Sequence, residues 1–193
     1  MERLSGCKAI TAFSNEIYQG SLSISIEGLL AEIERLRASD PGISRSNVGG
    51  YHSAPLRPSA SQPALQRLEG LASQQIRQIA DDLGLGPLRM TGLWANISGP
   101  GNRNDWHIHP FTCLSAVFYV QAPEGSGRLI LERPDPQTHF WRRYSQDDPR
   151  SRSRIAIDPQ AGDLIVFPAY LRHQVEENRS ADLRISCAMN FAY

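Results

Sequence analysis

The chain has 193 residues, which suits one domain with a substantial core and is too short for two ordinary domains. Its 20 basic and 20 acidic residues balance, so the total charge gives no support for a surface that binds nucleic acid or an anionic membrane. The three cysteines show no metal-type spacing, the N-terminus does not resemble a secretory signal, and no apolar run is long enough to span a membrane, so we expect a cytoplasmic protein.

The first part of the chain is predicted to be mainly helical. Apolar residues recur at helical spacing over 23–37, and Asp40-Pro41-Gly42 follows as a stop signal. A loop rich in Gly, Ser and Pro covers about 42–61, and a second apolar stripe predicts a helix over 63–85. We assign both stripes to core packing rather than to chemistry.

After Pro87 the apolar spacing becomes typical of strands. Segments rich in Gly, Pro and Asn separate short strand-like runs. These runs are predicted at 88–97, 114–120, 128–132, 154–157, 164–167 and 183–192. Strands that follow a helical part predict an α+β fold, namely a jelly roll braced by helices on one face. We expect a single domain over 1–193, with 1–86 as mainly helical support and 87–193 as the jelly-roll core.

Two of the five histidines, His107 and His109, are separated by a single residue. In an extended strand, residues i and i+2 face the same side, so the two imidazoles would form half of a metal site. A His-x-His pair also occurs as a hydrogen-bonded strand pair or an adventitious zinc binder, and by itself it does not decide between these roles. His173, which follows the run Gly162–Pro168, is the candidate for a third ligand.

Arg184 is the candidate for binding an anion near these histidines. Residues 174–177 read as a strand, 178–182 as a turn, and the chain after the turn as a strand again. Such a hairpin would bring His173 opposite Arg184 or close to it. A buried guanidinium there needs an anion such as a carboxylate, and Ser186, on the same face, adds a hydroxyl donor. For an isolated arginine a surface ion pair is the commoner role, and the nearby histidine favours the buried role.

Several segments resemble, in order and at compatible spacing, a family of small bacterial 2-oxoglutarate/Fe(II) oxygenases. The resemblance runs from about Ser46 to the C-terminus. It rests on the segments 49–53 (GGYHS), 94–97 (WANI), 107–110 (HIHP), 114–115 (LS), 118–120 (FYV), 126–129 (SGRL), 162–168 (GDLIVFP) through His173, and Arg184-Ile185-Ser186 to Asn190. It implies a double-stranded β-helix, a cupin-like jelly roll, with one Fe(II) and 2-oxoglutarate as cosubstrate.

The chain departs from the wider superfamily at one position. That superfamily binds iron through two histidines and a carboxylate that stands two residues after the first histidine, and here that position is His109. We therefore predict a three-histidine metal site of His107, His109 and His173, with Asp105 as an alternative to one histidine. Three histidines also suit zinc. Arg184 favours the oxygenase, because a zinc hydrase has no evident need for a buried guanidinium.

Two further residues are candidates for binding 2-oxoglutarate. Asn96 lies in a predicted core strand, where its amide reaches the cosubstrate or is a satisfied core asparagine. Tyr119 follows the histidine pair, and its phenol either reaches the same carboxylate as Arg184 or packs as an ordinary core aromatic. His52 and His139 are interpreted as surface histidines.

Substrate selectivity is predicted to reside in two connecting segments, 49–58 and 134–160. The second contains Phe140, Trp141 and Tyr144 beside several arginines. Such a loop either covers an anionic substrate or is a solvated loop without a role.

Two functions from different classes follow. The first is an Fe(II)/2-oxoglutarate-dependent dioxygenase that uses molecular oxygen, converts 2-oxoglutarate to succinate and hydroxylates a small molecule, an amino acid or a peptide side chain. The alternative is a cupin-like metal-binding protein or zinc enzyme without oxygenase activity. No catalytic residue beyond the metal ligands is predicted. Neither function calls for nucleic acid or a membrane as partner, and the sequence is compatible with a homodimer.

Overall fold

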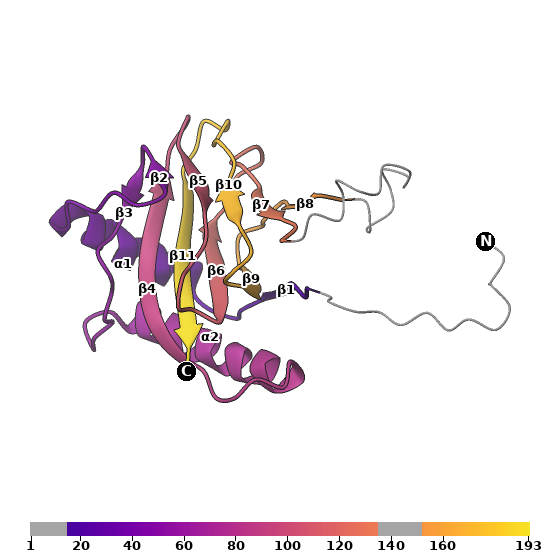
Figure 1. Cartoon of the computed structure of the whole chain (residues 1–193). Helices are drawn as coiled ribbons and strands as arrows, with labels where there is room; N and C mark the ends of the chain where they lie inside the picture. Colours follow the sequence, from indigo (N-terminus) through magenta and orange to yellow (C-terminus); the bar gives the residue numbers. More distant parts are fainter. Residues whose placement is uncertain (1–14, 135–151) are drawn as a thin grey trace, which may run out of the picture.

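A computed structural model describes residues 15–134 and 152–193. Its elements in chain order are β1 (Tyr18–Ser21), α1 (Ile26–Ser39), β2 (Asn47–Val48), β3 (Tyr51–His52), α2 (Pro63–Asp82), β4 (Arg89–Ser98), β5 (Arg103–His107), β6 (Leu114–Gln121), β7 (Leu129–Glu132), β8 (Arg154–Ile157), β9 (Asp163–Pro168), β10 (His173–Val175) and β11 (Arg184–Ala192). The strands pair antiparallel in a six-stranded sheet, β1-β9-β6-β11-β4-β3, and a five-stranded sheet, β2-β5-β10-β7-β8. This architecture of two antiparallel sheets and two helices confirms the predicted α+β fold with supporting helices (Figure 1).

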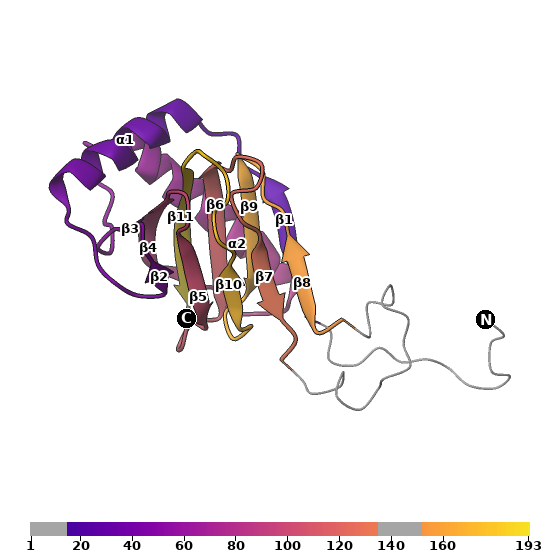
Figure 2. The same ribbon diagram turned by 90° about the horizontal axis from the view of Figure 1, so that it is seen from above.

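The six-stranded sheet separates a hydrophobic core from a polar interior. Along β4 and β11 the side chains alternate between its two faces. Leu93 and Ile97 of β4 join Ile185, Met189 and the apolar faces of both helices in the larger core. The intervening residues face the five-stranded sheet, which lies on the other side (Figure 2). The helices therefore stabilise the back of the sheet and leave its front face for a site.

The expected helices are confirmed, with small shifts of their ends. Ser25 caps α1, and its hydroxyl accepts a hydrogen bond from the backbone N–H of Gly28 at 3.2 Å. The strands predicted after Pro87 are confirmed as well, and β8 has the predicted bounds. The prediction for the first 86 residues is incomplete, because β1, β2 and β3 also lie there and extend both sheets. Among the described residues, no helix is both long and apolar enough to cross a membrane.

The predicted hairpin between His173 and Arg184 is wrong. β10 pairs with β5 and β7 in one sheet, whereas β11 pairs with β4 and β6 in the other. The turn between them carries the chain across the sandwich and is held by Asn178, whose amide donates to the carbonyl oxygens of Ser98 at 2.9 Å and Asp182 at 2.8 Å. His173 and Arg184 thus line one cavity from different sheets.

The start of α2 is capped by a residue of α1. Gln62, at the N-cap position, makes no side-chain capping bond. Instead the buried carboxylate of Glu32 accepts hydrogen bonds from the backbone N–H groups of Ala64 and Leu65, both at 2.9 Å. An anion at a helix N-terminus also interacts favourably with the helix dipole. This contact joins the two helices behind the six-stranded sheet.

Replacing Glu32 with alanine is expected to lower the free energy of unfolding by about 1.5–3 kcal/mol, because one buried and one part-buried N–H group lose a charged acceptor. Chemical denaturation of the purified protein measures this change. Glu34→Ala on the exposed side of α1 is the matched control and should change stability by less than about 0.5 kcal/mol. Equal effects of the two substitutions would contradict the capping role.

Candidate active site

A cavity of about 590 Å³ lies between the two sheets. Its walls are the inner faces of β4, β6 and β11 on one side and of β5, β7 and β10 on the other. All seven predicted site residues line it, namely Asn96, His107, His109, Tyr119, His173, Arg184 and Ser186. The fold therefore collects residues from distant parts of the sequence in one place.

The three predicted metal ligands form a cluster. His107 and His173 are paired in register on β5 and β10, with ring centroids 4.2 Å apart. The ring of His109 lies 5.0 Å from that of His107 and 5.1 Å from that of His173. The ligating atoms of the three side chains all lie within 4.8 Å of one another. Their arrangement has the composition and closeness of a three-nitrogen metal site.

Hydrogen bonds orient two of these rings for binding a cation. Nδ1 of His107 donates to the carbonyl oxygen of Asp105 at 2.7 Å, and Nδ1 of His173 donates to that of Leu171 at 2.8 Å. In both rings this leaves Nε2 with its lone pair available. Burial, and next the charge of the neighbouring His107, lowers the pKa of His109 to about 4 and that of His173 to about 3. The rings of His109 and His173 are therefore neutral near pH 7, as metal ligands must be.

Two details differ from the sequence prediction. β5 ends at His107, so His109 lies beyond the strand, and its ring reaches the cluster from a loop rather than by strand alternation. Asp105, the alternative ligand, is not in the cluster, and its exposed carboxylate accepts a hydrogen bond from Nε of Arg103 at 3.0 Å. The contribution of Asp105 to the cluster is the backbone carbonyl that orients His107.

The opposite wall of the cavity carries a row of polar side chains. Ser186 of β11 is paired with Asn96 on β4 and with Tyr119 on β6, so the three side chains lie side by side across the sheet. Arg184 stands two residues before Ser186 and faces the same side. Strand alternation thus explains why these four residues share one face.

Three buried polar atoms in this wall have no hydrogen-bond partner in the described part of the chain. Within 15–134 and 152–193, the buried side-chain atoms without a hydrogen bond are Oδ1 of Asn96, the hydroxyl of Tyr119 and Nη2 of Arg184. Such atoms are costly in a folded protein unless a ligand satisfies them. Burial raises the pKa of Tyr119 to about 12, so its hydroxyl keeps its proton and acts as a donor. The wall therefore offers a ligand two hydrogen-bond donors, from Arg184 and Tyr119, and the Asn96 amide, which can turn to donate or to accept.

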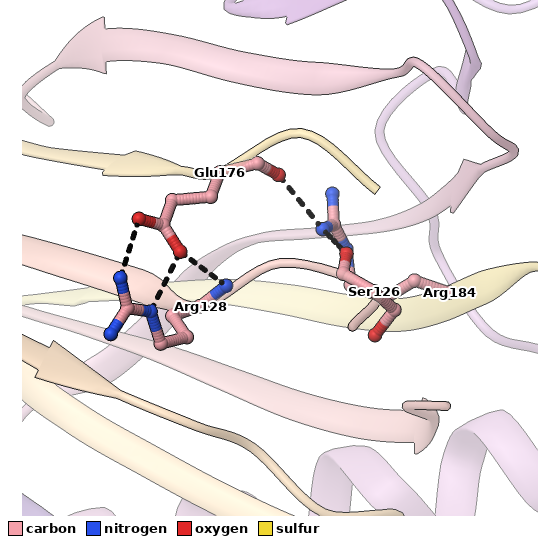
Figure 3. A network of polar contacts seen from close by, with 4 residues as sticks. All are labelled: Ser126, Arg128, Glu176 and Arg184. Carbon is pink, nitrogen blue, oxygen red and sulfur yellow. Dashed lines mark hydrogen bonds and ion pairs between the residues drawn. The ribbon is translucent and has the colours of Figure 1, made fainter. Parts of the chain in front are cut away.

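Backbone carbonyl groups hold one nitrogen of the Arg184 guanidinium (Figure 3). Nη1 donates to the carbonyl oxygens of Ser126 and of Glu176, the latter at 3.2 Å. The side chain of Glu176 turns away and binds Arg128 through two of its oxygens, at 2.8 and 2.9 Å. Arg184 is only 3% exposed, and burial lowers its pKa, although a guanidinium stays charged in proteins. Neutral carbonyls orient this charge without compensating it, so the cavity selects an anion.

Gly127 makes this close approach possible. Its φ is +99°, and a Cβ there would lie 2.7 Å from Nη1 of Arg184 and 2.9 Å from the carbonyl carbon of Glu176. Gly125, two residues earlier, also has a positive φ of +76°, but a Cβ there would meet no atom within 4 Å. The two glycines share the backbone strain of a substitution and differ in the contacts that a Cβ would make with Arg184 and with the backbone of Glu176 that holds it.

Gly127→Ala is therefore expected to weaken the binding of carboxylate ligands to the cavity by roughly tenfold or more, because it displaces the guanidinium. Gly125→Ala should leave this affinity unchanged while costing about 1–3 kcal/mol of backbone strain. Calorimetric titration with 2-oxoglutarate, beside denaturation of each variant, separates the two effects. Equal affinities of the two variants would show that the packing of Gly127 does not position Arg184.

His52 is a cavity residue that the sequence does not reveal. It is buried at 8% exposure and not on the surface, so the prediction of a surface histidine is wrong. Its ring stacks on Trp94, with centroids 5.6 Å apart and planes 8° apart. Nδ1 donates to the carbonyl oxygen of Ser53, which leaves Nε2 as an acceptor. A lone histidine in a loop rich in Gly and Ser gives no periodic signal, and its burial comes from its pairing with Asn96 and its stacking on Trp94.

The segment between α1 and α2 forms the other end of the cavity. This segment contributes five residues to the cavity lining, namely Ile43, Arg45, Ser46, His52 and Pro55. Asp40 holds this segment in place, because its carboxylate accepts hydrogen bonds from the backbone N–H groups of Gly42 and Ala54 and from the hydroxyl of Tyr51. Of the second predicted selectivity segment, 134–160, residues 135–151, with His139 and the aromatic residues, lie outside the described residues.

Solved structures with similar folds include prolyl hydroxylases and an α-ketoglutarate-dependent epimerase. One is a prolyl-4-hydroxylase from Pseudomonas putida, with a TM-score of 0.65 and 18% identity over 93% of this chain and 93% of that chain. Another is the non-heme α-ketoglutarate-dependent epimerase SnoN of nogalamycin biosynthesis, with a TM-score of 0.69 and 17% identity over 92% of this chain and 76% of that chain. A prolyl hydroxylase from Trichoplax adhaerens has a TM-score of 0.67 and 15% identity over 91% and 83%. At these identities the likeness shows the fold, here the double-stranded β-helix.

The sequence also matches a defined family directly. No curated protein sequence gives a significant match. The family profile described as "Putative 2OG-Fe(II) oxygenase" matches residues 92–190, just over half of the chain. The matched region runs from β4 to β11 and contains the histidine cluster and the polar row. The chain therefore belongs to this family of 2-oxoglutarate- and Fe(II)-dependent oxygenases.

Proposed function

We propose that the enzyme binds Fe(II) through His107, His109 and His173, binds 2-oxoglutarate through Arg184, and hydroxylates a small molecule, an amino acid or a peptide side chain. The observation that carries this proposal is the buried Nη2 of Arg184, which has no hydrogen-bond partner among the described residues and lies in the same cavity as three neutral histidines. A dianionic cosubstrate compensates both the guanidinium and the divalent ion bound by neutral ligands.

The donor set fits a carboxylate. Nη2 of Arg184 and the hydroxyl of Tyr119 are two buried donors without a partner in the described part of the chain. We assign both to one carboxylate group of 2-oxoglutarate. Ser186, which lies beside Tyr119 in the row, adds a hydroxyl, and Asn96 contributes its amide. Satisfying these groups on binding recovers the cost of burying them in the ligand-free cavity.

The bound ion and cosubstrate supply the oxidative chemistry: molecular oxygen is consumed, 2-oxoglutarate is converted to succinate and CO2, and one oxygen atom enters the substrate. The chain itself orients and shields. The carbonyls of Asp105 and Leu171 fix the rings of His107 and His173, and those of Ser126 and Glu176 fix Arg184. The two facing sheets bury Tyr119, Arg184 and Ser186 of the polar row, which shields these groups from bulk water.

We assign substrate binding to the part of the cavity lined by Arg45, His52 and Trp94, because the polar row of Asn96, Tyr119, Arg184 and Ser186 is assigned to the cosubstrate. This assignment keeps part of the predicted selectivity segment 49–58 and extends it toward Ile43. The neighbouring structures include enzymes titled as prolyl hydroxylases and as an epimerase and a carbocyclase of nogalamycin biosynthesis, so they support both peptides and small molecules as substrates.

The remaining chain-level assignments are also proposals. We infer that 1–193 acts as a single oxygenase domain in the cytoplasm. The contribution of β1, β2 and β3 to both sheets supports the single domain, since the first part of the chain completes the sandwich. The balanced charge supports an enzyme without a nucleic-acid partner.

Anaerobic addition of Fe(II) and then 2-oxoglutarate tests the proposal. We expect a weak visible charge-transfer band that requires both components, and succinate formation on admission of oxygen. Zn(II) in place of Fe(II) should bind without the band or succinate. A protein that binds Zn(II) but gives neither signal with Fe(II) would favour the alternative, a cupin-like zinc protein, for which Arg184 has no evident purpose.

A further inference from the structure

The three clustered histidines differ in what holds their rings. The rings of His107 and His173 are fixed by carbonyl oxygens two residues earlier in their own segments. His109 lies beyond the end of β5, and its backbone N–H donates to the carbonyl oxygen of Ala169 at 3.1 Å. In the described part of the molecule, the ring of His109 has one hydrogen-bonding neighbour, Asn190, whose Nδ2 lies 3.4 Å from Nδ1. The third ring therefore depends on a residue from the other sheet.

Asn190 is itself held in place. It stands near the end of β11, on the face that carries Arg184 and Ser186 further back along the strand. Its strand partner on β6 is Ser115, whose buried hydroxyl donates to Oδ1 of Asn190 at 3.0 Å. A chain of hydrogen bonds thus runs from β6 through β11 to the histidine cluster.

This series of hydrogen bonds can serve a histidine ring that binds a metal. When Nε2 of a histidine is a ligand, Nδ1 carries the proton and needs an acceptor. A half-turn of the Asn190 amide presents Oδ1 to that N–H and directs Nδ2 at Ser115, whose hydroxyl accepts as readily as it donates. The observed orientation, with Nδ2 toward His109, suits a ring whose Nδ1 is unprotonated. Both orientations satisfy every polar group in the chain.

We propose that Asn190, supported by Ser115, is a positioning residue that orients His109 and fixes its tautomer for metal binding. This role rests on the proposed metal site of His107, His109 and His173. It gives the third ligand the acceptor that the other two obtain from their own backbone. It also gives a role to the polar residue near the end of β11 that is distant from Arg184.

The test is a Co(II) titration of the full-length protein under anaerobic conditions, followed by visible absorbance. Asn190→Leu, which keeps the size and loses the acceptor, is expected to weaken Co(II) binding roughly 10–100-fold, the range seen for such outer partners. Asn190→Asp should retain near-native affinity, because a carboxylate accepts from Nδ1–H. Asn104→Leu is the matched control, because Asn104 also lines the cavity but its amide donates to the hydroxyl of Ser46 and not to a clustered histidine.

Native affinity of Asn190→Leu, or an equal loss in Asn104→Leu, would overturn the proposal. Ser115→Ala removes only the support of Asn190 and should weaken binding severalfold, which keeps the proposal testable if Asn190→Leu fails to fold. Nitrogen NMR of the Zn(II)-loaded protein adds a direct readout, because His109 should carry its proton on Nδ1 in the native protein and lose this preference in Asn190→Leu. His173→Ala separates the levels: native Co(II) affinity there would refute the metal site itself, whereas loss there with native affinity in Asn190→Leu would refute only the role of Asn190.

Discussion

Replacing His173 with alanine is expected to abolish iron-dependent turnover and to weaken metal binding by roughly 100-fold or more. The loss should exceed the 10–100-fold effect of residues that only orient ligands, because a coordinating nitrogen disappears. His173 is the most buried of the three clustered histidines and is paired directly with His107 on the neighbouring strand. Metal titration of the purified variant measures the effect, and His107→Ala and His109→Ala should behave alike.

His52→Ala is the control for this prediction. His52 is also a buried histidine of the cavity, but it is outside the cluster and stacks on Trp94. Its loss should leave metal affinity within a few-fold of the native value while altering the substrate end of the cavity. Metal affinity that falls equally in His52→Ala and His173→Ala would mean that the cavity binds cations without a defined ligand set.

The sequence predicts the parts of the fold that have a local cause. Apolar stripes at helical spacing mark α1 and α2, and alternation marks long strands such as β4 and β11. β2 and β3 have two residues each, too few for any period, and they exist because β5 and β4 offer partners. The turn after β10 can also be predicted from the sequence, but its residues do not tell which sheet the next strand joins. That choice is made by the pairing of β11 with β4 and β6, which is not local.

The candidate site shows the same division. His107, His173, Arg184 and Tyr119 could be predicted because each stands in or beside a strand whose alternation fixes the direction of its side chain. His52 could not, because its burial depends on Trp94 and on a pairing across a loop rich in Gly and Ser. The backbone carbonyls that hold Arg184 could not be predicted either, since residue types do not show which carbonyl groups a side chain will contact. Gly127 is the exception in principle, because a glycine between Ser126 and Arg128 is compatible with a close backbone approach.

The binding of 2-oxoglutarate should depend on the shape of the Arg184 guanidinium as well as on its charge. Nη1 is engaged by the carbonyls of Ser126 and Glu176, so the planar group is fixed with Nη2 directed away from them. A planar fork held in this way loses little conformational freedom when it binds a carboxylate. A lysine ammonium has the same charge but cannot bind both carbonyls and reach the ligand in the same geometry.

Arg184→Lys is therefore expected to weaken 2-oxoglutarate binding by roughly ten- to hundredfold, which corresponds to about 1.5–3 kcal/mol for the loss of charge-assisted hydrogen bonds. Metal affinity in the absence of 2-oxoglutarate should stay near the native value, because Arg184 lies on the opposite wall from β5 and β10. Calorimetric titration with 2-oxoglutarate measures the first quantity and Co(II) titration the second. Arg103→Lys, an exposed arginine of β5 paired with Asp105, is the matched control and should change neither. Native 2-oxoglutarate affinity in Arg184→Lys would mean that the buried guanidinium is a structural group and that the anion binds elsewhere in the cavity.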